Sequence, residues 1–326
     1  MENQTFLSAT RRELCPDLGA LGSPPEADLV ENCDALSDRL KAPNQCTIDD
    51  FWDSIIEPKG SFIQLNLGEI WRYRDLLYLF TRRDIVSFYK QTILGPLWFL
   101  IQPIFTTLIY VLVFGQIAQL STDGAPQLLF YMCGITFWNY FSECLNKTAT
   151  VFKDNANLFG KVYFPRVIVP LSIVLSNLTR FTIQFSLFAC FCAWFLWRGE
   201  ITPNAALLLL PLLVATMAIL GLGFGMLFSA MTTKYRDMVF LLQFGVQLLM
   251  YATPVIFPMS QIPARFARIL SWNPLAPIFE TARYGFLGAG TFTWSGLAYS
   301  VTFAITIFLL ATIAFNKVEK TFMDTV

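Results

Sequence analysis

The sequence predicts an all-α integral membrane protein with six transmembrane helices per chain. Of its 326 residues, 55% are hydrophobic and only 14% are charged, whereas soluble domains carry about 25% charged residues. Six apolar segments each reach or exceed the roughly 20 residues that a helix needs to cross a bilayer. Basic residues are concentrated in alternate loops between these segments, a pattern typical of a multi-pass topology.

Composition also excludes several functions. The net charge is zero, so charge gives no support for a nucleic-acid partner. The chain has no histidine, which excludes His-based catalytic triads and the usual zinc sites, and we predict no metal site. No phosphate-binding loop of the Gly-x-x-x-x-Gly-Lys-Ser/Thr type occurs, so any ATP used with this chain must be bound by another subunit.

Residues 1–60 form an acidic extension. Residues 1–59 contain twelve Asp or Glu against five Lys or Arg, and no apolar core of a signal peptide is present. We interpret this region as a flexible or weakly structured cytoplasmic segment. A short docking element around Asp49 to Ile56 is the alternative.

Residues 61–94 are predicted to form an amphipathic helix and a gate before the first span. Between Leu67 and Lys90, apolar residues recur on one broad face at about 100° per residue. Arg82, Arg83 and Lys90 gather on the opposite side. Such a helix beside a span is expected to lie in the membrane interface, and a helix packed on a soluble partner is the alternative.

Tyr89 to Pro103 is the stretch in which the charged helix gives way to the first apolar segment. Gly95-Pro96 breaks the helical pattern at this junction. We therefore expect the helix to lie along the membrane surface up to Lys90, to turn at Gly95-Pro96 and then to enter the bilayer.

Residues 95–316 contain the six predicted spans, and residues 317–326 form a short C-terminal segment. The second span is the weakest, because Asn139, Glu143 and Asn146 interrupt it. Gly221 and Gly225 form a G-x-x-x-G pattern in the fourth span and predict close helix packing. The spans are expected at about 97–118, 128–148, 167–194, 205–231, 238–257 and 292–315.

The loops predict the orientation. Ten Lys or Arg precede the first span, whereas the first loop, Gln119 to Pro126, has none and the third has only Arg198. The second and fourth loops are basic, and the long fifth loop carries Arg265, Arg268 and Arg283 spread over its length. By the positive-inside rule both termini are cytoplasmic.

The fifth loop, Pro258 to Gly290, is long and contains several prolines. Its apolar patches at Phe266–Leu270 and Ile278–Leu287 are too short to span a bilayer. They predict two short re-entrant helices that dip into the outer leaflet, where backbone must be helical or buried in protein. A plain extracytoplasmic loop is the alternative.

Polar side chains inside the predicted spans are further candidates. Arg180 falls about halfway along the third span, and Glu143 is its plausible partner, because intramembrane charges usually pair. A structural ion pair that locks two helices is the favoured interpretation, and Arg180→Ala is then expected to lower assembly more than activity. Gln243 and Gln247 share a face of the fifth span and either line a polar path or bond neighbouring helices.

The second loop, Phe152 to Arg166, is compact and rich in aromatic residues. Asp154 or Asn155 is suited to cap a short helix within it. Phe159, Tyr163 and Phe164 would then be exposed anchors by which a soluble motor binds the membrane unit. A simple interfacial turn is an equal alternative.

Five motifs, in order along the chain, resemble the permease subunit of ABC-2 type exporters for polysaccharides or polyol phosphates, whose members carry O antigens, capsules or wall teichoic acids. The resemblance covers about Leu67 to Lys320 and says nothing of the acidic extension. The motifs lie at Tyr89–Pro103, Leu158–Leu171, Lys234–Asp237, Thr253–Pro258 and Trp272–Gly288.

The resemblance implies a homodimer in the bacterial inner membrane, with each copy bound to one ATP-binding subunit that holds ATP and Mg. This chain would then be no enzyme by itself and would hold no cofactor. The resemblance places an interface helix at Leu67–Lys90 and a gate at Tyr89, Lys90, Gly95 and Pro96. The coupling helix that docks on the ATPase falls on Asn155, Asn157, Leu158, Phe159, Lys161 and Tyr163.

The implied substrate is a glycan linked to a polyprenyl pyrophosphate. Its phosphate lies at headgroup level, where Arg82, Arg83 and Lys90 can bind it by charge-assisted hydrogen bonds. Aromatic rings offer sugars a sliding surface with little hydrogen-bond specificity. Packing against lipid or helices is the alternative for each candidate, and the candidates are Trp98, Phe99, Phe105, Tyr110, Phe137, Trp138, Tyr140 and Phe141.

Three other functions compete with this interpretation. An ABC-2 exporter of a drug or small lipid shares the architecture, although the interface-helix and second-loop motifs favour a glycan. A membrane-embedded glycosyltransferase or acyltransferase would need a base or metal-binding carboxylates near the headgroups, where Asp75 and Asp84 form no paired pattern. A purely structural membrane subunit is the third.

Overall fold

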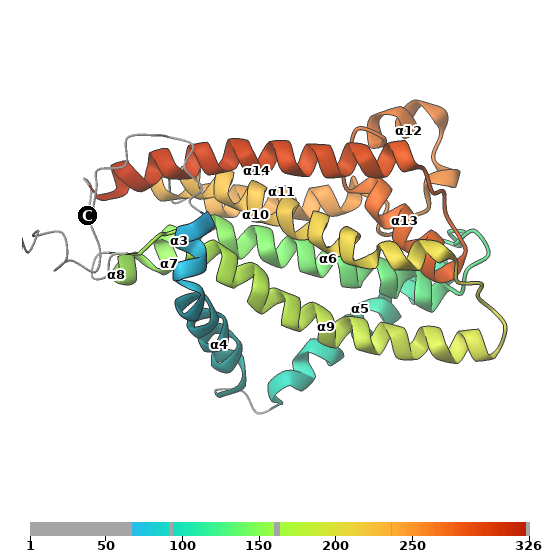
Figure 1. The fold of residues 1–326 in the computed structure, drawn as a ribbon. Coiled ribbons are helices and arrows are strands. Elements are labelled where there is room, and N and C mark those ends of the chain that lie inside the picture. Colours follow the sequence, from blue (N-terminus) through green and yellow to red (C-terminus); the bar gives the residue numbers. More distant parts are fainter. Residues whose placement is uncertain (1–66, 91–93, 160–163, 236, 324–326) are drawn as a thin grey trace, which may run out of the picture. The chain divides into compact units, whose positions relative to one another are not determined.

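The computed structural model describes residues 67–90, 94–159, 164–235 and 237–323. Within these ranges all regular secondary structure is helical (Figure 1), which confirms the all-α prediction for this part of the chain. The acidic extension, residues 1–60, lies outside the described residues, as do the predicted coupling residues Lys161 and Tyr163.

Within the described ranges, four helical segments are long and apolar enough to cross a membrane, and they match the first, third, fourth and sixth predicted spans. The shortest has 20 residues, which at 1.5 Å per residue reaches about 30 Å. The first is α5 (Trp98–Tyr110) continued by the π-helical η3 (Val111–Ile117), and the second is α9 (Ile168–Trp197). The others are η4 (Ala205–Leu209) with α10 (Leu210–Lys234), and α14 (Trp294–Met323).

The second and fifth predicted spans differ from these four. α6 (Gln127–Ala149) has 23 residues, enough to span, but polar residues lower its mean hydropathy. α11 (Met238–Tyr251) has 14 residues and rises only about 21 Å. The predicted end of this span at Phe257 is therefore wrong. The helix stops because a residue before proline, here Thr253 before Pro254, disfavours helical geometry.

α6 lies at the centre of the helical bundle. It packs against α5, α9 and α10, and α10 packs in turn against α14. A Cβ atom at Gly221 would lie 2.8 Å from the Cβ of Cys144, so only glycine allows α10 to approach α6 this closely. Gly225 has the same role beside Thr148. The predicted close-packing face of the G-x-x-x-G pattern is thus confirmed.

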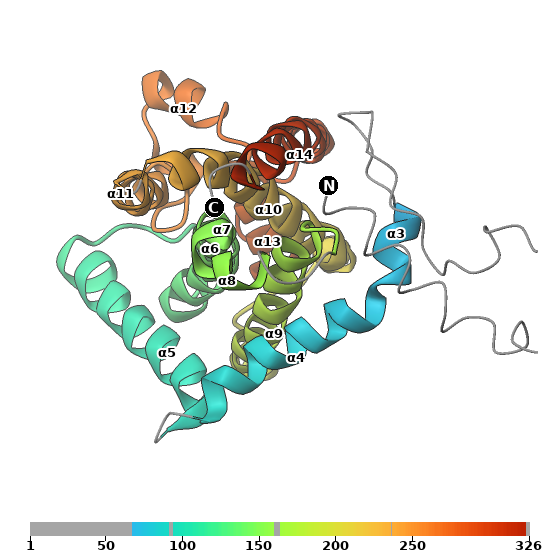
Figure 2. The same cartoon turned by 90° about the vertical axis from the view of Figure 1, so that its left-hand side faces the viewer.

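The predicted amphipathic helix forms two helices, α3 (Leu67–Arg72) and α4 (Arg74–Lys90). α4 lies across α9 (Figure 2). Its buried Phe80 packs edge-on against Phe164, with the ring centroids 5.7 Å apart. Tyr78 and Leu79 are exposed as well as the basic residues, so the polar and apolar faces are only partly separated.

The predicted turn before the first span is present. Gly95 begins a single 3-10 turn, η2 (Gly95–Leu97), which leads directly into α5. Gly95 has φ +50°, a left-handed conformation that favours glycine. The Leu97 amide donates to the Leu94 carbonyl at 3.1 Å and closes the turn.

The second predicted loop forms two short helices, α7 (Val151–Asp154) and α8 (Ala156–Phe159). The Asn155 side-chain amide donates to the Val151 carbonyl at 3.1 Å, and the Leu158 and Phe159 amides of α8 donate to the Asn155 backbone carbonyl. Phe159 is buried, with its ring 5.7 Å from that of Phe152. Phe164 is buried as well, with its ring 5.8 Å from that of Phe159. The prediction that Phe159 and Phe164 are exposed anchors is therefore wrong, because both rings belong to the core.

The fifth loop contains the two helices predicted there. α12 (Ala264–Leu270) is largely exposed, and α13 (Ala276–Leu287) is buried. In Figure 1 they lie at one end of the bundle, and α7 and α8 lie at the other end beside the C-terminal part of α14. Stacking of Phe152 on Phe315, with centroids 4.7 Å apart, fixes this second end.

Candidate functional site: a polar cavity between three helices

A polar cavity of about 330 Å³ lies between α5, α6 and α9, next to the turn at Gly95. In a helix bundle made mostly of apolar residues, such a cavity is the place where a polar ligand or water can be bound. Its lining consists of Gly95, Trp98, Phe99, Gln102, Asn139, Tyr140, Glu143, Asn177, Arg180, Phe181 and Gln184.

Helix geometry explains why these side chains meet. Asn139 and Glu143 are four residues apart on α6, and therefore lie on one face. Asn177, Arg180 and Gln184 follow each other at intervals of three and four residues on α9, again on one face. Seven residues of helix rise about 10 Å, so the polar row on α9 extends along the cavity.

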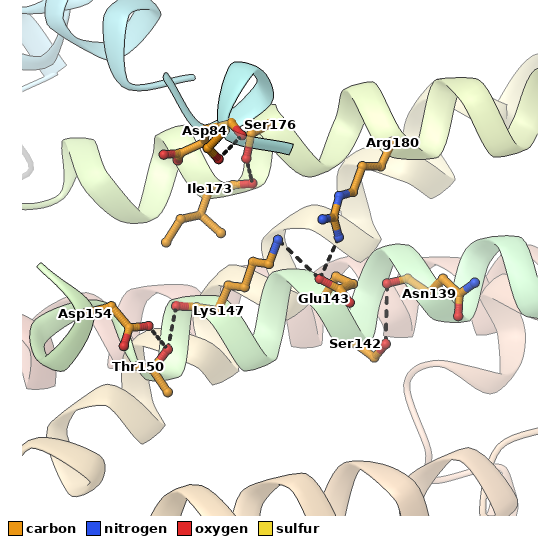
Figure 3. Close-up of polar contacts among 11 residues, drawn as sticks. Asp84, Asn139, Ser142, Glu143, Lys147, Thr150, Asp154, Ile173, Ser176 and Arg180 are labelled. Carbon is orange, nitrogen blue, oxygen red and sulfur yellow. Dashed lines mark hydrogen bonds and ion pairs between the residues drawn. The ribbon is translucent and has the colours of Figure 1, made fainter. Parts of the chain in front are cut away.

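An ion-pair cluster lies at the cavity (Figure 3), and two of its three members, Glu143 and Arg180, line it. Arg180 Nη1 lies 3.0 Å from Glu143 Oε2, and Lys147 Nζ lies 3.3 Å from the same oxygen. The Arg180 guanidinium carbon lies 4.7 Å from the centre of the Phe99 ring, as in a cation–π contact. The predicted pairing of Arg180 with Glu143 is confirmed, and Lys147 adds a second cation to it.

Asn177 is the most deeply buried polar group of the lining, with 2% of its surface exposed. Neither its amide nitrogen nor its amide oxygen has a hydrogen-bond partner that meets geometric criteria. The amide lies beside the Cys144 thiol, which is a weak hydrogen-bonding group. Leaving such an amide without a good partner costs about 1–3 kcal/mol, so the site is suited to a polar molecule in the cavity.

The predicted aromatic residues separate into groups. Trp98, Phe99 and Tyr140 line the cavity. Phe105 is exposed on α5, and Tyr110 is half-buried near Met250. The remaining candidates are buried against neighbouring helices, and these are Phe137, Trp138 and Phe141. Contrary to expectation, they do not face an open path.

The predicted gate residues are only partly brought to the cavity. Gly95 lines it, whereas Arg82 and Lys90 are exposed on α4. Arg83 Nη2 lies 2.8 Å from Asp84 Oδ1, and the Arg83 guanidinium carbon lies 5.0 Å from the Phe80 ring centre. The side chains of Tyr89 and Pro96 lie outside the described residues.

The predicted polar residues of the fifth span lie elsewhere. Gln243 and Gln247 are exposed on α11, as is Tyr251 one turn further on. In the coupling segment, Leu158 and Asn155 are half-buried, and the Asn157 side chain lies outside the described residues.

Sequence analysis missed the amide residues of the cavity, Gln102, Asn177 and Gln184. Their spacing could have indicated two of them, because Asn177 lies three residues before Arg180 and Gln184 lies four residues after it, which puts all three on one face of α9. The amides were overlooked because a single polar residue in an apolar helix carries no indication of its neighbours.

Sequence analysis also missed a second ion pair, in which Arg283 Nη1 lies 3.8 Å from Glu280 Oε1 on α13. Arg283 Nη2 donates to the Val255 carbonyl at 2.6 Å. Glu280 accepts from the backbone amides of Met259, at 3.3 Å, and Thr291, at 3.0 Å. Burial lowers the pKa of Arg283 to about 10, so the guanidinium stays charged at neutral pH.

A resident metal has no support in the described part of the chain, where no three His, Cys, Asp or Glu side chains are grouped to hold an ion. The ion-pair cluster has one carboxylate and two cations, which disfavours a metal ion.

Comparison with known proteins identifies relatives of the chain. The sequence profile described as ABC-2 type transporter matches residues 75–287, which include α5, α6 and α9. The O-antigen export system permease protein RfbA of Klebsiella pneumoniae is 27% identical over 264 residues, covering 80% of this chain and 98% of that protein. RfbA of Myxococcus xanthus is 28% identical over 219 residues, covering 65% and 80%. The polysialic acid transport protein KpsM of Escherichia coli is 24% identical over 202 residues, covering 62% and 77%.

Proposed function

This chain belongs to the ABC-2 type transporter family, and we propose that it is the membrane subunit of an ATP-driven exporter that moves a lipid-linked polysaccharide across the bacterial inner membrane. The observation that carries the proposal is the match to O-antigen permeases over 98% of the length of one relative. A second group of relatives is named for polysialic acid transport. Since both names refer to glycans, a glycan is better supported as the substrate than a drug or small lipid.

We propose that the working unit is a homodimer with two ATP-binding subunits, which hold ATP and Mg. α6 and α11 would complete a six-span chain, with both termini cytoplasmic and α12 and α13 dipping into the outer leaflet. α11 supports a partner because it exposes a largely apolar surface that includes Phe240, Phe244 and Leu248. In a membrane such a surface contacts either lipid or another helix.

The cytoplasmic end of the chain would contact both the ATP-binding subunit and the carrier lipid. Lys153 and Asp154 are exposed on α7, and with the predicted coupling residues other than the buried Phe159 they would dock on the ATP-binding subunit. Arg82 and Lys90 are exposed on α4, where they would bind the pyrophosphate of the carrier lipid. These roles make the α7–α8 segment a coupling element and α4 a loading element.

Deletion of the gene tests the export function. We expect surface glycan to be lost while the lipid-linked glycan accumulates inside the cell, because synthesis continues and translocation stops. The two pools are measured by electrophoresis of surface polysaccharide and by extraction of carrier lipids. Complementation with the intact gene is the control, and it should restore the surface pool.

Other outcomes would contradict the proposal. Unchanged surface glycan would exclude this substrate class. Loss of the lipid-linked pool as well as the surface pool would indicate an enzyme of glycan synthesis instead. Isolation of the tagged chain should also yield an ATP-binding subunit whose ATP turnover depends on this chain.

A further inference from the structure

We propose that the cavity between α5, α6 and α9 is a carbohydrate-binding subsite that holds a glycosyl unit of the exported polymer within a single chain. The inference rests on the proposed function and specifies it, because it names the part of the substrate that is bound and the residues that bind it. Three properties of the cavity support it, namely its amide groups, its aromatic rings and its charge balance.

The amide groups suit sugar hydroxyls. Each Asn or Gln side chain offers two donors and an acceptor, and a hydroxyl group can pair with either. Four amides line the cavity. Asn177 is the strongest of them, since both of its amide atoms are buried without a well-formed hydrogen bond. A sugar hydroxyl placed there would satisfy the amide that the helices leave unsatisfied.

The aromatic rings suit the other side of a sugar. A sugar ring has apolar C–H faces between its polar edges, and aromatic side chains bind such faces. Trp98, Phe99, Tyr140 and Phe181 share the lining with the amides. A mixture of aromatic and amide groups matches a sugar better than a lipid tail, which would leave the amides unpaired.

The charge balance disfavours a phosphate group as the occupant. Arg180 is held by the Glu143 carboxylate at 3.0 Å, and Lys147 approaches the same oxygen. Lys147 lies outside the lining, so the lining itself holds one cation and one carboxylate, and their charges cancel. A phosphate at Arg180 would have to lie close to this carboxylate, and like charges repel. The cavity is therefore suited to an uncharged or weakly charged glycosyl unit. The exposed basic residues of α4 remain the better place for the carrier's pyrophosphate.

The cavity is also accessible. The lining residues Gln102 and Trp98 are exposed, and Gly95, in the turn that leads into α5, belongs to the lining as well. A carrier lipid held at α4 would thus have its first sugars next to the cavity. The cavity extends along α9 from Asn177 to Gln184, a rise of about 10 Å. This length fits one or two sugar units rather than a long chain.

Site-specific photocrosslinking in the native host tests the occupant directly. The photoreactive residue p-benzoylphenylalanine replaces Gln102, which is exposed at the cavity. The matched control places it at Leu108, which is exposed on the same helix and lies outside the lining. Illumination should give a carbohydrate-staining adduct of high mass at position 102 and none at 108. An adduct that carries lipid without glycan, or equal adducts at both positions, would overturn the proposal.

The variant Asn177→Leu tests the binding group, since it removes both amide atoms with little change of volume. Thr182→Val is the control on the same helix, because Thr182 is exposed and bonds only its own helix carbonyl. In the crosslinking background, Asn177→Leu should lower the glycan adduct by roughly fivefold to tenfold at equal membrane level, the effect of one lost hydrogen-bonding amide. Thr182→Val should leave it unchanged.

These measurements separate the subsite from the export function. If gene deletion leaves surface glycan unchanged, the export function itself is wrong. If deletion abolishes surface glycan, but Asn177→Leu keeps a full glycan adduct and full export, only the subsite is wrong. If Asn177→Leu is poorly inserted in the membrane, the photocrosslinking experiment at position 102 still decides the proposal, because that chain retains Asn177.

Discussion

Two ion-pair clusters among the described residues, one on α13 and one at the cavity, differ in what surrounds them. Glu280 and Arg283 are buried, with 4% and 1% of their surface exposed, and each also binds backbone groups of neighbouring segments. Glu143, Arg180 and Lys147 are partly exposed and lie beside an open cavity. The first cluster connects parts of the chain, and the second leaves space for another molecule.

The comparison separates a structural charge from a functional one. Arg283 joins α13 to the segment after α11 through the carbonyls of Val255 and Phe257, and it lies 3.6 Å from the centre of the Phe130 ring on α6. Both of its Nη atoms donate to carbonyls within the fold, whereas its buried Nε has no hydrogen-bond partner among the described residues. The carboxylate of Glu143 is shared by two cations, so removing either leaves the other paired. The comparison predicts opposite effects for the same substitution at Arg283 and at Arg180.

The largest effect is expected for Arg283→Met, which leaves Glu280 as a buried charge without its partner and the Val255 carbonyl without its donor. Breaking a buried pair in this way costs about 3–5 kcal/mol. We expect a large fall in the unfolding temperature of the detergent-purified protein and in its membrane level. Arg268→Met, the same change at an exposed arginine of α12, should alter neither.

A second substitution sharpens this result. Combining Arg283→Met with Glu280→Gln removes the unpaired charge, and part of the lost stability should return, because the remaining amide can still accept from a backbone N–H. If the double variant is as unstable as the single one, the loss is due to packing around Arg283 and not to the stranded carboxylate.

The next effect is expected for Arg180→Met. Glu143 keeps Lys147, so the free energy of unfolding should change by no more than about 1 kcal/mol. Export should nevertheless fall by roughly tenfold, as for the loss of a charged hydrogen-bond donor to a ligand. Surface glycan per unit of membrane protein measures this, with Arg198→Met beyond the end of α9 as the control.

This expectation reverses the one drawn from the sequence. Two opposite charges in neighbouring spans indicated a helix lock, and the ion pair does exist. The structure changes its meaning because Arg180 also lines the cavity and contacts Phe99. A loss of membrane protein as large as that of Arg283→Met, with normal export per molecule, would restore the interpretation as a lock.

Hydropathy predicted the long helices well because their lipid-facing surfaces are apolar in any arrangement. It ranked α6 as the weakest span, yet α6 is the centre of the bundle and mostly buried. Two of the three polar residues that interrupt the span, Asn139 and Glu143, face the cavity, whereas Asn146 lies outside its lining. A scale that assumes lipid as the surroundings cannot distinguish a poor span from a span with a polar protein neighbour.

The aromatic residues show the same limit. Phe99, Phe105 and Phe137 are equivalent in the sequence, but in the structure one lines the cavity, one is exposed and one is buried. Local spacing gives the face of a helix and not the partner of that face. The Glu280–Arg283 pair was missed for a related reason. The backbone groups that it binds belong to Val255, Met259 and Thr291, which lie in segments before and after α13, so no local pattern in the sequence indicates them.

The smallest effect is expected for Lys147→Met, which tests whether charge or position makes Arg180 functional. Lys147 binds the same Glu143 oxygen as Arg180, but it lies outside the cavity lining. If position decides, Lys147→Met should lower export by less than about threefold and leave stability nearly unchanged, as for a partly exposed pair. Lys317→Met on α14 is the control for loss of a lysine. Equal losses of export for Lys147→Met and Arg180→Met would show that the cluster acts through its total charge. Arg180 would then belong to a charged patch and would not be a specific binding group, and the comparison with the buried Glu280–Arg283 pair would have to be changed accordingly.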